Sequence, residues 1–224
     1  MDSDYQKKMA AIASVEYIKD GMLVGLGSGS TAAHMIRELG KKVAEGLSIK
    51  AVPSSDTTAQ LARKVGISLI SLEEAGKLDI NIDGADEFDG KLQLIKGGGG
   101  ALLREKIVAY NSKFNIVISD ASKQVERLGK FKLPLETIPF ATKNIMTQLD
   151  EMGLRPVLRK NGSSVYLTDE NNYIVDVDIF EKDNLVALNQ NLINIPGVVE
   201  TGLFLDTTDL ILMGTADDTV IIKK

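Results

Sequence analysis

The chain has 224 residues, 44% hydrophobic and 25% charged, an ordinary composition for a globular protein of one large domain or of one medium and one small domain. Lysine and arginine number 26 and aspartate and glutamate 31, and the resulting formal charge of −5 argues against a broad nucleic-acid-binding surface. Because no cysteine is present, the sequence excludes disulfides, thiolate nucleophiles and cysteine zinc sites.

The N-terminal stretch predicts an amphipathic helix over residues 4–19. We expect a cytoplasmic protein without a signal peptide or membrane contact, because no run approaches the ~20 apolar residues that a membrane span needs. Short apolar runs and helical periodicity then alternate. Strands are predicted at 22–26, 47–52, 67–70, 78–82, 91–95 and 114–119, and helices at 31–45, 56–65 and from the glycines at 97–100 to Tyr110. This alternation predicts an α/β, Rossmann-like domain with a mostly parallel sheet and helices on both faces.

The pattern changes near Phe131, where two prolines interrupt a strand-like run. Helices are predicted at 143–152 and 183–194, and strands at 154–159, 163–168, 173–179 and after Pro196-Gly197. The order β-α-β-β-α-β is that of a ferredoxin-like α+β unit. The last apolar runs, at 203–205, 210–213 and 220–222, are expected to return to the first sheet. We therefore expect a large α/β catalytic domain of residues 1–130 plus 204–224, and a small α+β lid domain of residues 131–203.

A glycine-rich stretch at residues 25–31 (GLGSGST) joins a predicted strand to a predicted helix. Free amides at a helix start attract an anion, and the hydroxyls of Ser28, Ser30 and Thr31 add donors. The dinucleotide fingerprint needs a glycine where Ser30 stands, and no lysine is placed as in a Walker loop. The stretch therefore predicts a phosphate site, with a tight turn capped by Ser30 or Thr31 as the alternative.

Three carboxylates, Asp83, Asp86 and Glu87, follow the strand at 78–82 in the motif DGADE. Such close like charges repel one another and need lysines, a metal ion or a functional reason to share a pocket. Open α/β sheets bind ligands at this edge. The motif favours a functional site, and a solvated acidic turn and a divalent metal site stay open as alternatives.

Residues 96–106 read KGGGGALLREK. Four consecutive glycines lose much backbone entropy on folding, which favours a loop whose amides wrap a ligand. Lys96 precedes this loop, and Glu105 lies about one turn into the next helix, where its carboxylate can face the same pocket. The alternative is a surface glutamate paired with a neighbouring cation.

Two further lysines are candidates for the same site. Lys123 follows a strand end in SDASK, and Lys7 lies in the N-terminal helix. For each, the alternative is a solvated surface lysine. His34, the only histidine, is expected to be a packed or half-exposed helix residue rather than a catalyst.

Together these motifs resemble the type A ribose-5-phosphate isomerases over nearly the whole chain. The resemblance is carried by GLGSGSTAAH, AVPSSD, DGADE, LIKGGGGALLREKI, ISDASKQVERLGKF and NIPGVVETGLF. Two departures are small: Ser28 stands where threonine is common, and Leu103 replaces a frequent threonine. The resemblance implies an aldose–ketose isomerase of the pentose phosphate pathway that interconverts ribose 5-phosphate and ribulose 5-phosphate. It also implies no metal, no organic cofactor, and a homodimer or homotetramer.

The resemblance further implies that Glu105 is the base that moves a proton between C1 and C2 through an enediolate. Lys96 and the amides of residues 97–100 would stabilise the enediolate, Asp83 would open the sugar ring, and Asp86 would hold Lys96 charged and oriented. The implied substrate contacts are Ser28, Gly29, Ser30, Thr31, Asp83, Gly84, Ala85, Asp86, Lys96, Gly97, Gly98, Gly99 and Lys123, with Lys7 near the phosphate.

Two other functions compete with this interpretation. Some transcriptional repressors use the same fold as a sugar-phosphate sensor, but they carry a helix-turn-helix, whereas the N-terminal helix here leads straight into the predicted sheet. A metal-dependent phosphosugar hydrolase would use Asp83, Asp86 and Glu87. The type B ribose-5-phosphate isomerases rely on a cysteine base, which this chain lacks.

Overall fold

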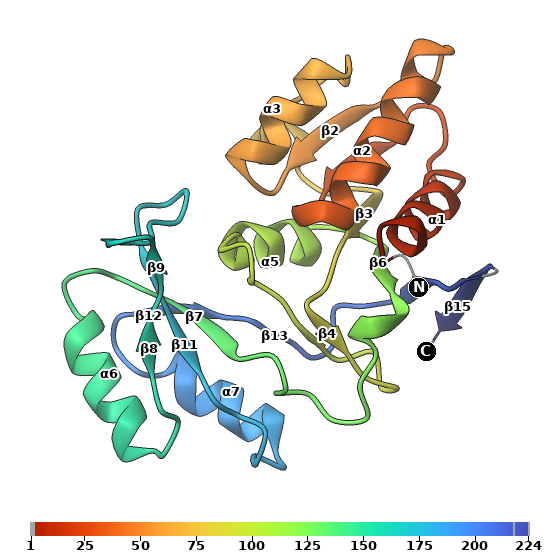
Figure 1. Ribbon diagram of the computed structural model, residues 1–224. Helices are drawn as coiled ribbons and strands as arrows, with labels where there is room; N and C mark the ends of the chain where they lie inside the picture. The colour runs from red at the N-terminus through yellow and green to blue at the C-terminus, as the bar shows by residue number, and fades with distance from the viewer. Residues whose placement is uncertain (1–2, 217, 224) are drawn as a thin grey trace. The chain divides into compact units, whose positions relative to one another are not determined.

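A computed structural model describes residues 3–216 and 218–223, and the chain divides into two compact units (Figure 1). The first unit comprises Met1–Ala85, Arg104–Gln124 and Asp206–Lys224, and the second comprises Asp86–Leu103 and Val125–Leu205. The chain therefore passes between the units after Ala85 and again after Leu103, inside two of the predicted motifs. Among the described residues, no helix is both long and apolar enough to cross a bilayer.

The first unit is built on a six-stranded sheet. Its strands are β1 (Leu23–Leu26), β2 (Lys50–Pro53), β3 (Ile80–Asp83), β6 (Asn115–Asp120), β14 (Leu210–Gly214) and β15 (Thr219–Lys223), in the order β15-β14-β6-β3-β1-β2. Every pair is parallel except that of β14 with β15. This confirms the predicted mostly parallel sheet.

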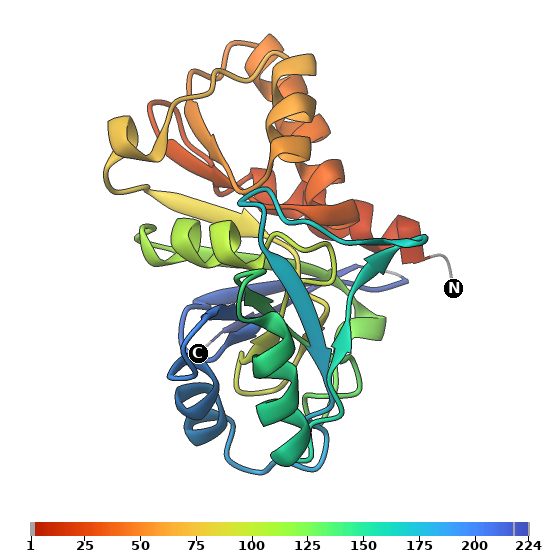
Figure 2. The ribbon, with the colours of Figure 1, turned by 90° about the vertical axis from the view of Figure 1, so that its left-hand side faces the viewer.

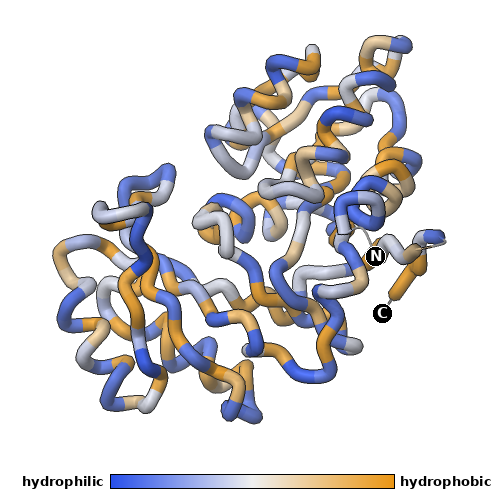
Figure 3. Tube along the Cα trace, in the orientation of Figure 1, coloured by the Kyte–Doolittle hydropathy of each residue, from blue (hydrophilic) through white to orange (hydrophobic). Residues whose placement is uncertain are grey.

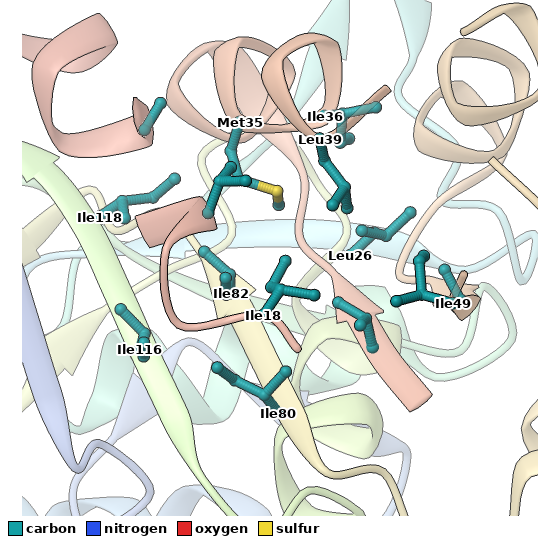
Figure 4. Packing of buried hydrophobic residues seen from close by; sticks show 14 of the residues in the cluster. Ile18, Leu26, Met35, Ile36, Leu39, Ile49, Ile80, Ile82, Ile116 and Ile118 are labelled. Atoms are coloured by element: carbon teal, nitrogen blue, oxygen red, sulfur yellow. The ribbon is translucent and has the colours of Figure 1, made fainter. Parts of the chain in front are cut away.

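Helices cover both faces of this sheet. α1 (Ser3–Val15) and α2 (Gly29–Ala44) share a core with one face, and in Figure 4 Met35 and Leu39 of α2 point toward the strands that carry Leu26, Ile82 and Ile116. α5 (Leu102–Tyr110) covers the other face through Val108. The short helices α3 (Asp56–Lys64) and α4 (Leu72–Ala75) follow β2. Figure 3 shows helices with alternating hydrophilic and hydrophobic segments, as amphipathic elements require.

The second unit contains a four-stranded antiparallel sheet in the order β12-β7-β11-β8. Its elements in chain order are β7 (Leu133–Thr137), α6 (Thr142–Glu151), β8 (Val157–Leu158), β11 (Tyr173–Val177), α7 (Leu185–Ile193) and β12 (Val198–Thr201). Side chains of both helices share one apolar core with β7 and β11, so α6 and α7 cover the same face (Figure 2). This is the predicted ferredoxin-like arrangement.

Two smaller pieces complete the second unit. The hairpin of β9 (Lys160–Asn161) and β10 (Ser164–Val165) is inserted between β8 and β11. A three-stranded sheet combines β4 (Glu87–Phe88), β5 (Leu94–Ile95) and β13 (Leu203–Phe204) in the order β13-β5-β4.

The structure corrects two details of the sequence-based expectations. Residues 203–205 do not return to the first sheet, because β13 pairs with β5. The stretch 67–70 forms only an isolated bridge between Leu69 and Ala51. The compact units also differ from the predicted division, since residues 86–103 pack in the second unit. The predicted domain boundary stays a prediction.

Candidate functional site

The first glycine-rich loop joins β1 to α2 and is shaped by close backbone approaches. A Cβ at Gly25 would lie 2.6 Å from Val108 Cγ1, and one at Gly27 would lie 2.1 Å from Asp83 Oδ1. Gly29 has φ of +86°, which favours glycine, and Ser28 is the N-cap of α2. The predicted caps Ser30 and Thr31 therefore lie inside the helix. Gly25 and Gly27 thus leave room for the neighbouring side chains of Val108 and Asp83, and Gly29 is the first residue of α2.

Asp83 at the end of β3 holds this loop in place through hydrogen bonds. Its Oδ1 accepts hydrogen bonds from the amides of Ser28 (2.9 Å) and Gly84 (2.7 Å), and the side chain is 3% exposed. Asp83 is thus a buried group that holds the start of α2 and lies at the carboxyl edge of the sheet.

The Ser28 hydroxyl lies in a cluster of hydroxyls that sequence reasoning did not predict. It contacts Ser54 Oγ at 2.8 Å, Ser55 Oγ at 2.9 Å and Thr58 Oγ1 at 3.2 Å. Thr58 Oγ1 in turn donates to the Gly27 carbonyl (2.9 Å). The motif AVPSSD contains the two serines. Their contacts with Ser28 depend on the pairing of β2 with β1, which the motif alone does not indicate.

The start of α2 suits an anion. The first backbone N–H groups of a helix have no partner within the helix, and the dipole is positive there. This helix has 16 residues with no acidic residue in its first turn, and Lys41 and Lys42 lie in its last turn. Ser30 is exposed and Thr31 is 9% exposed. The loop therefore has a helix start without an acidic residue and an exposed hydroxyl, and phosphate binding there stays a prediction.

Glu105 lies in the first turn of α5 and is 5% exposed. It shares a helix face with Val108, three residues later, which packs over Gly25 of β1. Just after α5 the chain bonds to the segment that leads into β3, where the Leu78 amide donates to the Asn111 carbonyl at 2.8 Å. Glu105 therefore lies one helical turn closer than Val108 to the carboxyl edge of the sheet. Gly27, after β1, and Asp83, at the end of β3, lie at the same edge. The alternative of a solvated surface glutamate is excluded by its burial.

Lys7 and Lys123 are brought to one corner of the first unit. The short helix η1 (Ala121–Lys123) follows β6, and the Ala121 amide donates to Gln6 Oε1 at 3.3 Å. Gln6 precedes Lys7 in α1, and its carbonyl lies so close to Gly214 that a Cβ there would approach within 1.9 Å. Both lysine side chains are half-buried. These contacts make the corner a second cationic feature at the carboxyl edge.

Asp86 and Lys96 face each other at the end of a hairpin in the second unit. Glu87 pairs with Ile95 between β4 and β5, so Asp86 and Lys96 occupy the next opposed positions. Asp86 Oδ2 accepts the Gly98 amide at 2.7 Å. Lys96 is 4% exposed, and its Nζ lies 5.6 Å from the centre of the Phe204 ring, a cation–π distance. The motif DGADE thus serves two units: Asp83 belongs to the first and Asp86 to the second.

The loop of four glycines, Gly97–Gly100, follows Lys96. Gly97 and Gly100 have φ of +100° and +81°, and the Gly100 amide donates to the Gly97 carbonyl at 2.9 Å. Gly98 and Gly99 are exposed. The loop is therefore a defined turn, as the glycine run requires, and its two middle residues are accessible.

The other groups singled out in the sequence have structural surroundings. His34 Nε2 lies 2.9 Å from Asp4 Oδ1 on the outside of α1 and α2, as expected for a helix residue. Glu87, the third acid of DGADE, accepts the amides of Gly129 (2.8 Å) and Phe131 (2.6 Å). Within residues 3–216 and 218–223, no three His, Asp or Glu side chains are grouped as metal ligands.

The family model of ribose 5-phosphate isomerase A (phosphoriboisomerase A) matches residues 50–218. The chain belongs to this family. A ribose-5-phosphate isomerase A of Ruegeria sp. (strain TM1040) is 50% identical, with 98% of this chain and 87% of the relative covered. That of Limosilactobacillus reuteri (strain DSM 20016) is 46% identical, with 97% and 96% covered.

Solved structures agree with the family membership. Ribose 5-phosphate isomerase A from Methanocaldococcus jannaschii is 42% identical, with a TM-score of 0.93 and with 97% of this chain and 98% of that chain covered. A D-ribose-5-phosphate isomerase in complex with phospho-erythronic acid is 36% identical, with a TM-score of 0.96 and with both chains fully covered at 100%. The resemblance stated from the motifs is thereby confirmed, and so are the α/β fold class and the isomerase class of enzyme.

Proposed function

We propose that this protein interconverts D-ribose 5-phosphate and D-ribulose 5-phosphate, with Glu105 as the base. The observation that carries the proposal is the buried carboxylate of Glu105, in the first turn of the helix that follows the tetraglycine loop, in a chain of this family. A general base must lie within reach of the proton that it takes, and fixed donors must stabilise the anion that forms. The family membership supplies the substrate class.

The proposed reaction begins with opening of the sugar ring, which we assign to Asp83. Glu105 then takes the proton from C2 of the open-chain aldose, and the electron pair forms the C1–C2 double bond of an enediolate. Return of that proton from Glu105 to C1 gives the ketose, while a proton moves from the C2 oxygen to the C1 oxygen. Atoms and charges balance without an oxidant or reductant, because both steps are proton transfers.

We assign the stabilisation of the enediolate to Lys96 and to the tetraglycine loop of residues 97–100. Donors that are fixed before the reaction lower the energy of a developing oxyanion, since no solvent must reorganise. Asp86 supports this group, because it lies opposite Lys96 in the hairpin and already accepts the Gly98 amide.

The phosphate is the proposed handle of the substrate. We assign it to the amides and hydroxyls of residues 28–31 at the start of α2, with Lys123 and Lys7 as cationic partners. Gly84 and Ala85 border the site through their backbone. The relative solved with phospho-erythronic acid supports a sugar phosphate as the substrate class, because that ligand is also a phosphorylated sugar derivative. A cytoplasmic location and assembly into a homodimer or homotetramer stay predictions.

The direct test is an assay for ribulose 5-phosphate formed from ribose 5-phosphate, run before and after exhaustive chelation and dialysis. We expect full turnover in both samples and no release of inorganic phosphate. Activity restored only by Mg²⁺, Mn²⁺ or Zn²⁺ would contradict the cofactor-free mechanism. Phosphate release would favour a hydrolase, and sugar-phosphate binding without turnover would favour a sensor.

A further inference from the structure

Three successive carbonyls of the tetraglycine loop are held by two side chains from a distant part of the second unit. Arg159 Nη1 donates to the carbonyls of Gly97 (2.8 Å) and Gly98 (3.0 Å). The Tyr166 hydroxyl donates to the carbonyl of Gly99 (2.8 Å). None of these contacts follows from the sequence, because more than 60 residues separate the partners.

Arg159 is fixed before it reaches the loop. Its Nε donates to Asp176 Oδ2 at 2.9 Å, and its Nη2 bonds to Asp176 Oδ1, so the guanidinium and the carboxylate form a two-point pair. The side chains of Arg159 and Asp176 are only 14% and 18% exposed. Asp176 belongs to β11, a central strand of the four-stranded sheet. The planar guanidinium is therefore aimed at the loop by a rigid element.

Tyr166 is held beside Arg159 by the hairpin of β9 and β10. The Tyr166 amide donates to the Arg159 carbonyl at 3.0 Å, and the guanidinium lies 5.9 Å from the centre of the tyrosine ring. Burial raises the pKa of Tyr166, so its hydroxyl stays protonated and able to donate at neutral pH. A Cβ on Gly100 would lie 2.4 Å from this hydroxyl oxygen, which explains why the fourth position must be glycine.

Holding the carbonyls also fixes the amides. In a trans peptide the N–H of each residue points away from the carbonyl of the residue before it. The Gly98 amide is bonded to Asp86 and the Gly100 amide to the Gly97 carbonyl. The Gly99 amide, in contrast, has no partner within the residues that the structure describes, and Gly99 is exposed. The accessible N–H group of the loop is thus that of Gly99, and hydrogen bonds hold the backbone on both sides of it.

We propose that Arg159 and Tyr166 are positioning residues that hold the Gly99 amide in place as a donor to the enediolate oxygen. This inference rests on the proposed function, because it names the amide that carries out the stabilisation assigned to the loop. Arg159 and Tyr166 act through the backbone and do not themselves touch the substrate. Their effect is therefore on the rate of proton transfer rather than on phosphate binding.

The test uses Tyr166→Phe, which removes one hydroxyl and keeps the ring, and Arg159→Lys, which keeps the charge and loses the two-point fork. We expect kcat to fall about tenfold in each variant, the effect of one or two lost hydrogen bonds, with KM for ribose 5-phosphate within about twofold of wild type. The inhibition constant of phospho-erythronic acid should rise in parallel with the loss in kcat, while that of inorganic phosphate should not change.

Two matched controls separate positioning from general damage. Tyr173→Phe changes a tyrosine of β11 in the same unit, and Arg155→Lys changes an arginine whose side chain is 72% exposed. Both controls should keep wild-type kcat. Hydrogen exchange of the peptide that spans residues 97–100 should be faster in Tyr166→Phe than in wild type and in Tyr173→Phe.

The outcomes are distinct. If the wild-type protein does not isomerise ribose 5-phosphate, the proposed function fails, while the exchange experiment still tests how the loop is held. A folded Tyr166→Phe with wild-type kcat and unchanged exchange would overturn the inference even if the isomerase activity is real. Equal losses in the variants and their controls would also overturn it. If Tyr166→Phe does not fold, Arg159→Lys decides with the same readouts.

Discussion

The two glycine-rich loops of this protein have similar composition but are held in opposite ways. In the first, at residues 25–31, Asp83 binds backbone amides, and a cluster of hydroxyls fixes Ser28 and the Gly27 carbonyl. In the second, Gly97–Gly100, Arg159 and Tyr166 bind backbone carbonyls. The supporting groups of the first loop lie within about 60 residues of it, whereas those of the second lie more than 60 residues away.

This difference shows how each loop is suited to its proposed task. The first loop leads into a helix of 16 residues whose start attracts an anion, so it is suited to anchor a phosphate whose charge does not change. The second loop is fixed through its carbonyls, so it is suited to the proposed role of holding an amide as a donor to charge that develops only during the reaction. We therefore expect changes at the first loop to act on binding and changes at the second to act on turnover.

The largest expected effect is that of Glu105→Gln, in the helix that follows the second loop in the chain. The substitution keeps size and hydrogen bonding and removes the base, so kcat should fall by about 10²–10⁴-fold while substrate binding largely survives. Steady-state kinetics and binding of phospho-erythronic acid measure the two effects. Glu151→Gln, at an exposed position of α6, should be neutral. A near-normal kcat in Glu105→Gln would contradict the proposed mechanism.

The double variant Ser30→Ala, Thr31→Ala tests the anchoring role of the first loop. Each lost hydrogen bond to a charged phosphate contributes about 1.5–3 kcal/mol, so KM should rise roughly 10²-fold or more, with kcat at saturation changed much less. Thr147→Ala on the exposed side of α6 is the control. A fall in kcat at constant KM would reverse the roles assigned to the two loops.

Alanine at one glycine of each loop separates close packing from accessibility. Gly27→Ala would place its Cβ 2.1 Å from Asp83 Oδ1 and 2.4 Å from Asp83 Cα, whereas a Cβ at Gly99 has no heavy atom within 4 Å. Unfolding in urea should show a loss of about 1–3 kcal/mol for Gly27→Ala and under ~0.5 kcal/mol for Gly99→Ala. Equal losses of unfolding free energy in the two variants would mean that the first loop rearranges to accommodate the added methyl group, although the structure shows it tightly packed.

The smallest expected effect concerns the strands beneath the first loop. The Leu23 amide donates to Asp79 Oδ2 at 2.9 Å, and this bond, followed by that of Lys113, lowers the pKa of Asp79 from its usual 3.8. Because the folded pKa is below the unfolded one, the stabilisation is present above about pH 4 and is lost as the pH falls through the folded value.

The measurement is the free energy of unfolding from pH 2 to pH 6 in wild type and in Asp79→Asn. Asp79 is 30% exposed, so we expect a difference of only about 0.2–1 kcal/mol at pH 6, which disappears at the acid end. Asp183→Asn removes the partner of Arg127 at a side chain that is 91% exposed, and it should show no such dependence. A difference that grows toward low pH would have the wrong sign.

The fold class and the family were predictable because they depend on local patterns. Alternating strands and helices indicate a parallel sheet, and the glycine runs, DGADE and the glutamate after KGGGG occur at fixed spacing along the chain. The sequence did not predict that β13 pairs with β5, since an apolar run such as 203–205 suits either sheet. It also did not predict the segment 86–103 in the second unit, because a hairpin and a loop carry no signal of which core they pack against.

What the sequence by itself determined is the set of chemical groups: no thiol, one histidine, strand-end carboxylates and two glycine-rich turns, all set by residue type and short-range spacing. The tertiary structure alone decided the partners of those groups. Asp83 was expected to take part in the reaction, and in the structure its carboxylate also accepts hydrogen bonds from two backbone amides. Arg159 and Tyr166 carried no motif at all, and they reach the tetraglycine loop because strand pairing between residues far apart in the chain brings their side chains to its carbonyls.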